Sequence, residues 1–157
     1  QQDRFIIKEV LNYPTATEEL EVLNRIEKNV FQNGKKVVNI NDVKYLQELS
    51  KRVYIDEIVK KYIISIVYAT RNVNKVIDPK LARYVTSGAS TRASIAFMEA
   101  SKALALINGR TYVTPDDIKM LSYSILRHRI DLNFEAIADE VKVETIIDAI
   151  IASIKVP

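Results

Sequence analysis

Length, composition and charge set the first limits on this chain. It has 157 residues and a formal net charge of +3, and its 23 basic and 20 acidic residues are interleaved rather than gathered into the basic patch of a nucleic-acid binder. It contains no cysteine, which excludes disulfides and thiolate metal sites and agrees with a cytoplasmic location. No apolar run approaches the roughly 18 residues that a membrane span needs. With three glycines and no tryptophan, the composition favours one compact helical domain.

The N-terminal segment predicts a strand. Residues 5–7 read Phe-Ile-Ile, and no nearby segment offers a hairpin partner for their backbone groups. We therefore expect the last strand of a sheet outside this chain. Residues 1–12 would be the end of that preceding core, and residues 13–157 a helical domain. The start at Gln1, without methionine, also suggests a piece of a longer protein.

Caps predict the next two helices. Thr15 and Glu18 have the spacing of a capping box, and apolar residues then recur on one helical face as far as Val30. Asn41 is expected to cap the second helix. The apolar residues of the first face are Leu20, Leu23, Ile26 and Val30, and those of the second are Val43, Leu46 and Leu49.

The most regular pattern lies between residues 55 and 67. Apolar residues recur there at intervals of three and four, which predicts a helix although isoleucine and valine favour strands. Arg71 is interpreted as a charge that complements the dipole at the helix end. The face comprises Ile55, Ile58, Val59, Tyr62, Ile63, Ile66 and Val67.

Three connections are predicted between helices. Asn33-Gly34 is typical of a tight turn, so a small hairpin between residues 30–31 and 37–38 is expected. Residues 73–79 read as a polar connection, and residues 81–85 as a brief helical or extended turn.

The chain is organised around a glycine turn and the long helix that follows it. Gly88 is expected to break the chain, because glycine adopts backbone angles that other residues resist. Ser90 would then cap the helix and place Arg92 in its first turn. Asn108-Gly109 is typical of the end of such a helix. Its predicted apolar face is Phe97, Ala100, Leu104 and Ile107.

Two further helices complete the predicted domain. Thr114 is expected to cap one that begins at Pro115, because proline fits the first helical position. The last helix is expected at about residues 144–154. The apolar residues of the first are Ile118, Leu121, Ile125 and Leu126, and those of the second are Ile146, Ile147, Ile150, Ile151 and Ile154.

Between these helices lies the segment Arg127-His128-Arg129. His128 is the only histidine, and it lacks both the further ligands of a metal site and the orienting partner of a general base. It is therefore interpreted as a structural or surface residue. Arg127 and Arg129 remain open between contact with a nucleotide and contact with a neighbouring subunit.

Arg92 is the main candidate for ligand binding. Free N–H groups at the start of a helix and a guanidinium together favour an anion, and phosphate above all. The alternative is a solvated surface arginine, because basic residues are common in exposed first turns.

The segment from Gly88 onward resembles the C-terminal lid of MoxR-type AAA+ ATPases. The resemblance rests on GAS-x-RAS before an alanine-rich helix and on GR-x-YVTPDDIK after it, with Thr91 where the family usually has proline. It extends to "DRF" and "YP" near the start and to "ATR" at residues 69–71. By this resemblance Arg92 is the sensor 2 residue, which contacts ATP phosphates in cis.

Arg4 matches the arginine finger of that family, which would act in trans on the nucleotide of the neighbouring subunit and stabilise charge on the γ-phosphate. The alternative is a terminal arginine without a role, because Asp-Arg-Phe is a short motif.

The resemblance also implies a fold class, cofactors and partners. The fold would be all-α, a lid-type helical bundle with a short N-terminal strand left from the α/β core. ATP and Mg²⁺ would bind the intact protein, and neither is expected to bind this segment tightly alone. The partners would be neighbouring subunits of a hexameric ring and client proteins, some with a von Willebrand A domain, but neither membrane nor nucleic acid. The alternatives are the lid of a magnesium-chelatase-like ATPase and a free-standing helical module that binds DNA or protein.

The 157 residues contain no P-loop. The motif G-x-x-x-x-G-K-[ST] needs two glycines five residues apart, and the three glycines are Gly34, Gly88 and Gly109. No apolar strand ends in the paired acids that would hold magnesium, so no metal ligand is assigned. We therefore expect that the chain alone does not hydrolyse ATP, whereas an intact ATPase would.

Overall fold

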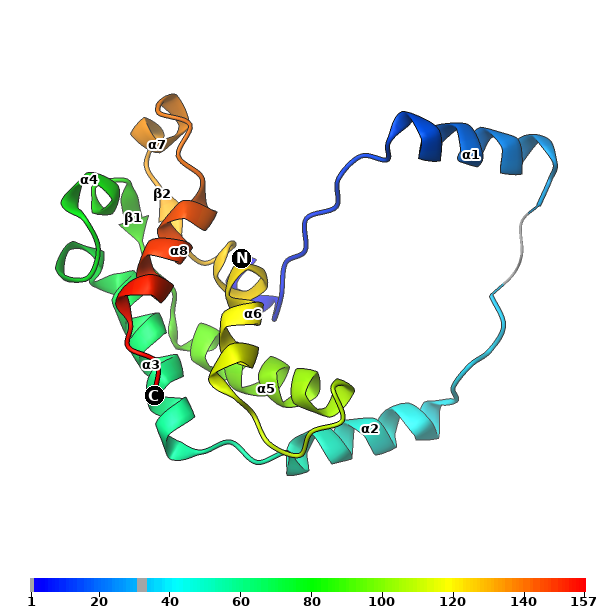
Figure 1. Ribbon diagram of the computed structural model, residues 1–157, viewed down its shortest axis with the longest axis horizontal. Helices are drawn as coiled ribbons and strands as arrows, with labels where there is room; N and C mark the ends of the chain where they lie inside the picture. Colours follow the sequence, from blue (N-terminus) through cyan, green and yellow to red (C-terminus); the bar gives the residue numbers. More distant parts are fainter. Residues whose placement is uncertain (1, 31–33) are drawn as a thin grey trace.

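The computed structural model describes residues 2–30 and 34–157 (Figure 1). This part of the chain is mainly helical, as predicted, and its one small sheet has two strands. In chain order the elements are η1 (Gln2–Arg4), α1 (Ala16–Glu27), α2 (Ile40–Arg52), α3 (Glu57–Arg71), η2 (Val73–Lys75), α4 (Pro79–Ala82), β1 (Val85–Ser87), α5 (Thr91–Ile107), α6 (Pro115–Leu126), β2 (Asp131–Leu132), α7 (Phe134–Ala138) and α8 (Val143–Ser153), where η denotes a 3-10 helix.

The hydrophobic core lies between α3, α5, α6 and α8 (Figure 1). The apolar face predicted for α3 is confirmed, except that Ile58 is 54% exposed. Each fully buried large apolar side chain contributes about 1.5–3 kcal/mol, so this cluster is the main source of stability. Its largest fully buried apolar members are Ile66, Val67, Phe97, Ile118, Ile125, Leu126, Ile146, Ile147 and Ile150.

The buried face of α5 differs from the predicted one. Phe97 is buried as expected, but Ile107 is 81% exposed. Small side chains let neighbouring helices approach closely, and this explains why the alanines of α5 lie inward instead of its last isoleucine. The other buried residues of α5 are Ala93, Ala96, Ser101 and Ala105.

Two short β contacts tie loops together. β1 and β2 pair antiparallel, with Ser87 opposite Asp131, so the chain just before Gly88 lies beside the segment that follows α6. A parallel bridge joins Tyr54 to Tyr112, which places the loop before α3 beside the loop before α6. Both contacts connect segments that are distant in the sequence.

The helix caps follow the sequence closely. Thr15 forms the predicted capping box with Glu18, and Thr114 is the predicted cap of α6, where it also forms a capping box with Asp117. Ser90 caps α5, and Gly109 follows that helix with a φ of 71°. The N–H groups of residues 109 and 110 bond carbonyls in the last turn of α5, which is the hydrogen-bond pattern of a Schellman end.

Two predicted helix boundaries were wrong by a few residues. α2 is capped by Asn39 rather than Asn41, because the Asn39 side chain accepts hydrogen bonds from the N–H groups of residues 41 and 42. α1 ends at Glu27 rather than near Val30, because Asn29 takes a left-handed φ of 52°. The hairpin predicted around Asn33-Gly34 includes residues 31–33, which lie outside the described part of the chain.

The strand predicted at residues 5–7 is not formed in the structure. A strand needs a neighbouring strand for its backbone groups, and among the described residues none lies beside this segment. The carbonyl groups of Phe5 and Ile6 instead accept hydrogen bonds from side chains that follow α6.

α1 lies apart from the helical bundle (Figure 1). None of its residues is buried, and Leu20, Leu23 and Ile26 are 57%, 62% and 55% exposed. The predicted apolar face is therefore present, but no described residue buries it. Among residues 2–30 and 34–157, no helix has both the length and the hydropathy required to cross a membrane.

Candidate functional site

The start of α5 is placed by a close approach of the glycine turn to the end of α3. A Cβ atom on Gly88 would lie 2.2 Å from the carbonyl oxygen of Thr70. The next N–H group, that of Ala89, donates to the Thr70 hydroxyl at 2.9 Å, and both of these residues are buried. Gly88 is required here for space, whereas the sequence suggested a backbone-angle requirement, and it is Gly109 that has a positive φ.

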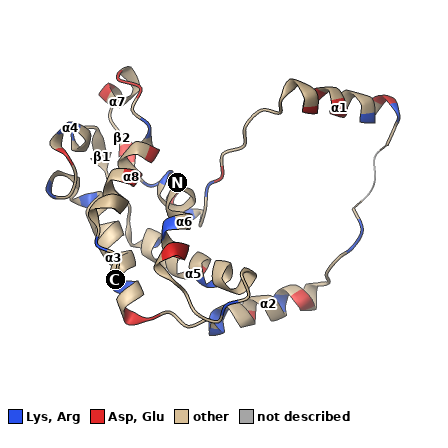
Figure 2. Ribbon diagram, viewed as in Figure 1, with Lys and Arg blue, Asp and Glu red and all other residues tan. Residues whose placement is uncertain are grey.

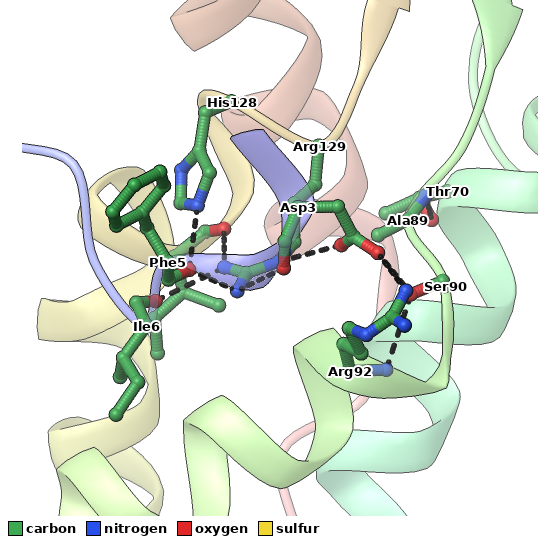
Figure 3. A network of polar contacts seen from close by, with 10 residues as sticks. Asp3, Phe5, Ile6, Thr70, Ala89, Ser90, Arg92, His128 and Arg129 are labelled. Carbon is green, nitrogen blue, oxygen red and sulfur yellow. Dashed lines mark hydrogen bonds and ion pairs between the residues drawn. The ribbon is translucent and has the colours of Figure 1, made fainter. Parts of the chain in front are cut away.

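Arg92 lies in the first turn of α5, as predicted, and its guanidinium is paired with a carboxylate (Figure 3). Its Nη1 lies 3.0 Å from Oδ2 of Asp3, and the Arg92 side chain is 60% exposed. The Ser90 hydroxyl donates to the same oxygen at 2.9 Å and accepts the backbone N–H of Arg92 at 3.2 Å. The start of α5 therefore already holds one anionic group.

Arg129 is the second arginine that contacts Asp3 (Figure 3). It is buried. Its Nε donates to Oδ1 of Asp3 at 3.0 Å, and its side chain is only 2% exposed. Its other two nitrogens donate to backbone carbonyls of the N-terminal segment and of α6, namely those of Asp3, Phe5, Ile6 and Ile125. This arginine fastens residues 3–6 to the end of α6.

The Asp3 carboxyl group is ionised in this setting. Its partial burial raises the pKa, but hydrogen bonds from Ser90, Arg92 and Arg129 outweigh that effect and hold the pKa below the ordinary value of 3.8. The arrangement is therefore one carboxylate between two guanidinium groups, with a net positive charge.

His128 supports the same segment. Its Nε2 donates to the Phe5 carbonyl at 3.0 Å, and its buried Nδ1 has no hydrogen-bond partner among the described residues. Burial lowers the pKa of His128, with the charge of Arg129 acting in the same direction against the hydrogen bond to Phe5. These contacts agree with the structural role predicted for His128.

A polar pocket of about 420 Å³ borders this network. Ser87 donates across it to the Asp131 carboxylate at 2.6 Å, within the pairing of β1 and β2. The pocket lies beside the start of α5, because Gly88 and Ser90 both line it. It is lined by Gln2, Asp3, Ser87, Gly88, Ser90, His128, Arg129 and Asp131.

Arg4, the other predicted site residue, lies at the end of η1 and is exposed. Within residues 2–30 and 34–157 it forms no ion pair. The structure thus brings Asp3, the residue before Arg4, into contact with Arg92. The trans role of Arg4 remains a prediction.

The remaining conspicuous arginines have contacts within the bundle. Arg127 pairs with Glu144 at 2.6 Å, and the Arg71 guanidinium lies 5.9 Å from the centre of the Tyr68 ring. Arg110 forms a bidentate ion pair with the buried Asp117. None of the described residues forms a cluster of three or more His, Cys, Asp or Glu side chains fit for a metal ion.

Sequence reasoning identified Arg92 but missed Asp3 and the part played by Arg129. The available signal was two arginines flanking the only histidine just after a predicted helix. The partner of these residues lies 126 positions away for Arg129 and 89 positions away for Arg92, so no local pattern connects them.

The chain is similar to known proteins over its whole length. The model of the AAA lid domain matches residues 81–150. Chaperone MoxR1 of Mycobacterium tuberculosis is 32% identical over 157 residues, and protein YeaC of Bacillus subtilis is 38% identical over 158 residues. These alignments cover 100% of the chain but 41% and 47% of the two relatives, so the chain spans less than half their length.

A solved structure also matches nearly the whole chain. A protein from Cytophaga hutchinsonii that is assigned as an ATPase matches with a TM-score of 0.89 and 40% identity, over 99% of this chain and 47% of that one. The family model, the relatives and this structure agree with the lid predicted from the motifs. The chain therefore carries an AAA lid domain and resembles MoxR-type AAA+ ATPases across its whole length.

Proposed function

We propose that this segment closes over the nucleotide of an ATP-hydrolysing AAA+ ATPase, and that Arg92 binds the phosphates. The single observation that supports the proposal is that the start of α5 already binds a negatively charged group, the carboxylate of Asp3. Arg92 and Ser90 both donate to Oδ2 of Asp3, at 3.0 and 2.9 Å. A phosphate oxygen, like this carboxylate oxygen, is a negatively charged hydrogen-bond acceptor.

The donors present fit ATP better than they fit its metal ion. A guanidinium and a hydroxyl at the beginning of a helix, beside a polar pocket, suit phosphate oxygens. Magnesium takes oxygen ligands, usually one or two carboxylates with water and phosphate, and the described residues offer no acidic cluster for it. In our proposal the rest of the protein supplies the metal ligands, and this segment supplies Arg92.

The wider mechanism follows from the family. Subunits would form a ring, a hexamer in our proposal, with Arg4 reaching the nucleotide of the neighbouring subunit. Movement of the lid on hydrolysis would pass to the next subunit and remodel a client protein, of the von Willebrand A type among others. The relative named as a chaperone supports this chaperone-like action, which we place in the cytoplasm.

The surface charges favour this proposal over a DNA-binding module. Figure 2 shows basic and acidic positions interspersed along the helices instead of one basic face. The first turn of α6 also carries the exposed Asp116, whose carboxylate would repel a phosphate backbone. The identity to MoxR1 across the whole chain favours a MoxR-type lid over a magnesium-chelatase-like one.

The test is the substitution Arg92→Ala in the full-length protein. Losing a charge-assisted contact of about 1.5–3 kcal/mol should weaken ATP binding or lower kcat/KM by about tenfold or more. Arg83→Ala is the matched control, because Arg83 is also about half exposed (55%) and pairs with a distant carboxylate, that of Asp139. Kinetics equal to the wild type for Arg92→Ala would refute the role.

A further inference from the structure

Asp3 joins two arginines that differ in how firmly they are held. Its Oδ1 faces Arg129 at 3.0 Å, and its Oδ2 faces Arg92 at 3.0 Å and Ser90 at 2.9 Å (Figure 3). Asp3 in η1 thereby joins the start of α5, which supplies Arg92 and Ser90, to the segment after α6, which supplies Arg129. One carboxylate therefore serves both the fixed framework and the candidate phosphate-binding arginine.

The contact between Asp3 and Arg129 is buried and is supported by several further hydrogen bonds. The Arg129 side chain is 2% exposed, and its guanidinium also binds four backbone carbonyl groups. Removing the carboxylate would leave a buried guanidinium without its counter-charge, which costs more than breaking an exposed pair. Asp3 is thus held close to α5 whether or not Oδ2 is occupied.

The Arg92 contact is replaceable. Its side chain is 60% exposed, and its guanidinium has Asp3 as its carboxylate partner among the described residues. Exposed single pairs contribute little to stability. A polyphosphate carries more negative charge than one carboxylate and can form bidentate hydrogen bonds with a guanidinium. It can therefore displace Oδ2 of Asp3 from Arg92.

We propose that Asp3 competes with the nucleotide for Arg92, so that its carboxylate occupies the guanidinium until a phosphate group replaces it. The proposal rests on the function proposed for Arg92. Because Arg129 keeps Asp3 nearby, the carboxylate returns when the phosphate leaves. Asp3 then competes with ATP, and the affinity for ATP is lower than Arg92 alone would give.

The experiment compares Asp3→Asn with the wild type in the full-length protein, by titration with a non-hydrolysable ATP analogue. Asparagine has the size of aspartate but lacks the charge that competes with phosphate. The analogue should bind about two- to fivefold more tightly, the range expected for loss of one exposed pair. A merely structural role would give the opposite sign, because a loosened site binds less well.

A double-mutant comparison locates the effect. In an Arg92→Ala background, Asp3→Asn should leave the affinity unchanged, because the competition acts through Arg92. Asp139→Asn is the matched control, since it also removes a carboxylate from an exposed arginine pair, that with Arg83, and does not line this pocket. Asp3→Glu restores the charge and should bring the affinity back toward the wild-type value.

The outcomes separate the two proposals. If Arg92→Ala weakens binding but Asp3→Asn leaves it unchanged or weaker, Asp3 does not compete and only this inference fails. If the effect of Asp3→Asn persists without Arg92, the inference also fails. If Arg92→Ala itself has no effect, the proposed function fails first. Thermal unfolding of each variant excludes a folding defect as the source of a change.

Discussion

The substitution Asp117→Asn tests how the motif after α5 stabilises the bundle. Asp117 is 3% exposed and lies in the first turn of α6. Its two oxygens accept from the Arg110 guanidinium at 2.8 and 2.5 Å, and Oδ2 also accepts the backbone N–H and the hydroxyl of Thr114, at 2.8 and 3.0 Å. One carboxylate thus joins the loop after α5 to the start of α6.

The expected cost follows from these contacts. Hydrogen bonds to charged groups contribute about 1.5–3 kcal/mol, and removing one partner of a fully buried pair costs about 3–5 kcal/mol. Because the Arg110 side chain is 26% exposed, water can solvate part of its charge after the substitution. We therefore expect Asp117→Asn to lower the free energy of unfolding by about 2–3 kcal/mol, which corresponds to about 4–12 °C in Tm for a chain of this size.

Acid should reduce this difference. Burial raises the pKa of Asp117, but the contacts with Arg110 and Thr114 outweigh it, so the folded-state pKa lies below the ordinary 3.8. A carboxyl group with a lowered pKa stabilises the fold above its unfolded-state pKa and loses that contribution as the pH falls through the folded-state value. The gap between wild type and Asp117→Asn should be constant above about pH 5 and shrink below 3.8.

The assay is urea unfolding of the chain followed by circular dichroism, at several pH values. Asp116→Asn is the control, because the neighbouring Asp116 has a side chain that is 87% exposed and lies 3.4 Å from Lys119. That change should cost no more than about 0.5 kcal/mol. Equal effects of the two substitutions, or a loss under about 0.5 kcal/mol for Asp117→Asn, would refute the structural role of the pair.

Two other predictions concern the glycine turn and the chemistry of the isolated chain. Gly88→Ala should destabilise the fold by about 2–3 kcal/mol, in the upper part of the range for overpacking, because its Cβ would lie 2.2 Å from the Thr70 carbonyl oxygen. Gly34→Ala, whose added Cβ would have no atom of the other described residues within 4 Å, should be close to neutral, and similar Tm values for the two would contradict this account. The purified 157-residue chain should not hydrolyse ATP, because it has no P-loop. Phosphate release that persists in an Arg92→Ala preparation would point to a contaminating ATPase. Phosphate release that this substitution abolishes would overturn the prediction.

Local patterns in the sequence predicted most of the helical framework. The spacing from Ile55 to Val67 identified α3, and the caps at Thr15, Ser90 and Thr114 marked three helix starts correctly. These features depend on residues within one or two turns of each other, where hydrogen bonds and side-chain spacing are set by the helix itself. The same range explains why Arg92 could be placed at a helix start from sequence.

The tertiary structure alone decided which groups meet at that start. The buried face of α5 runs through its alanines because α3 and α6 pack closely against it, a property of the neighbouring helices as much as of α5. Gly88 is needed because the end of α3 passes within contact distance, and Asp3 finds its partners 87 to 126 residues away. Contacts at such separation leave no periodic signal in the chain, since they arise only when the hydrophobic core brings the elements together.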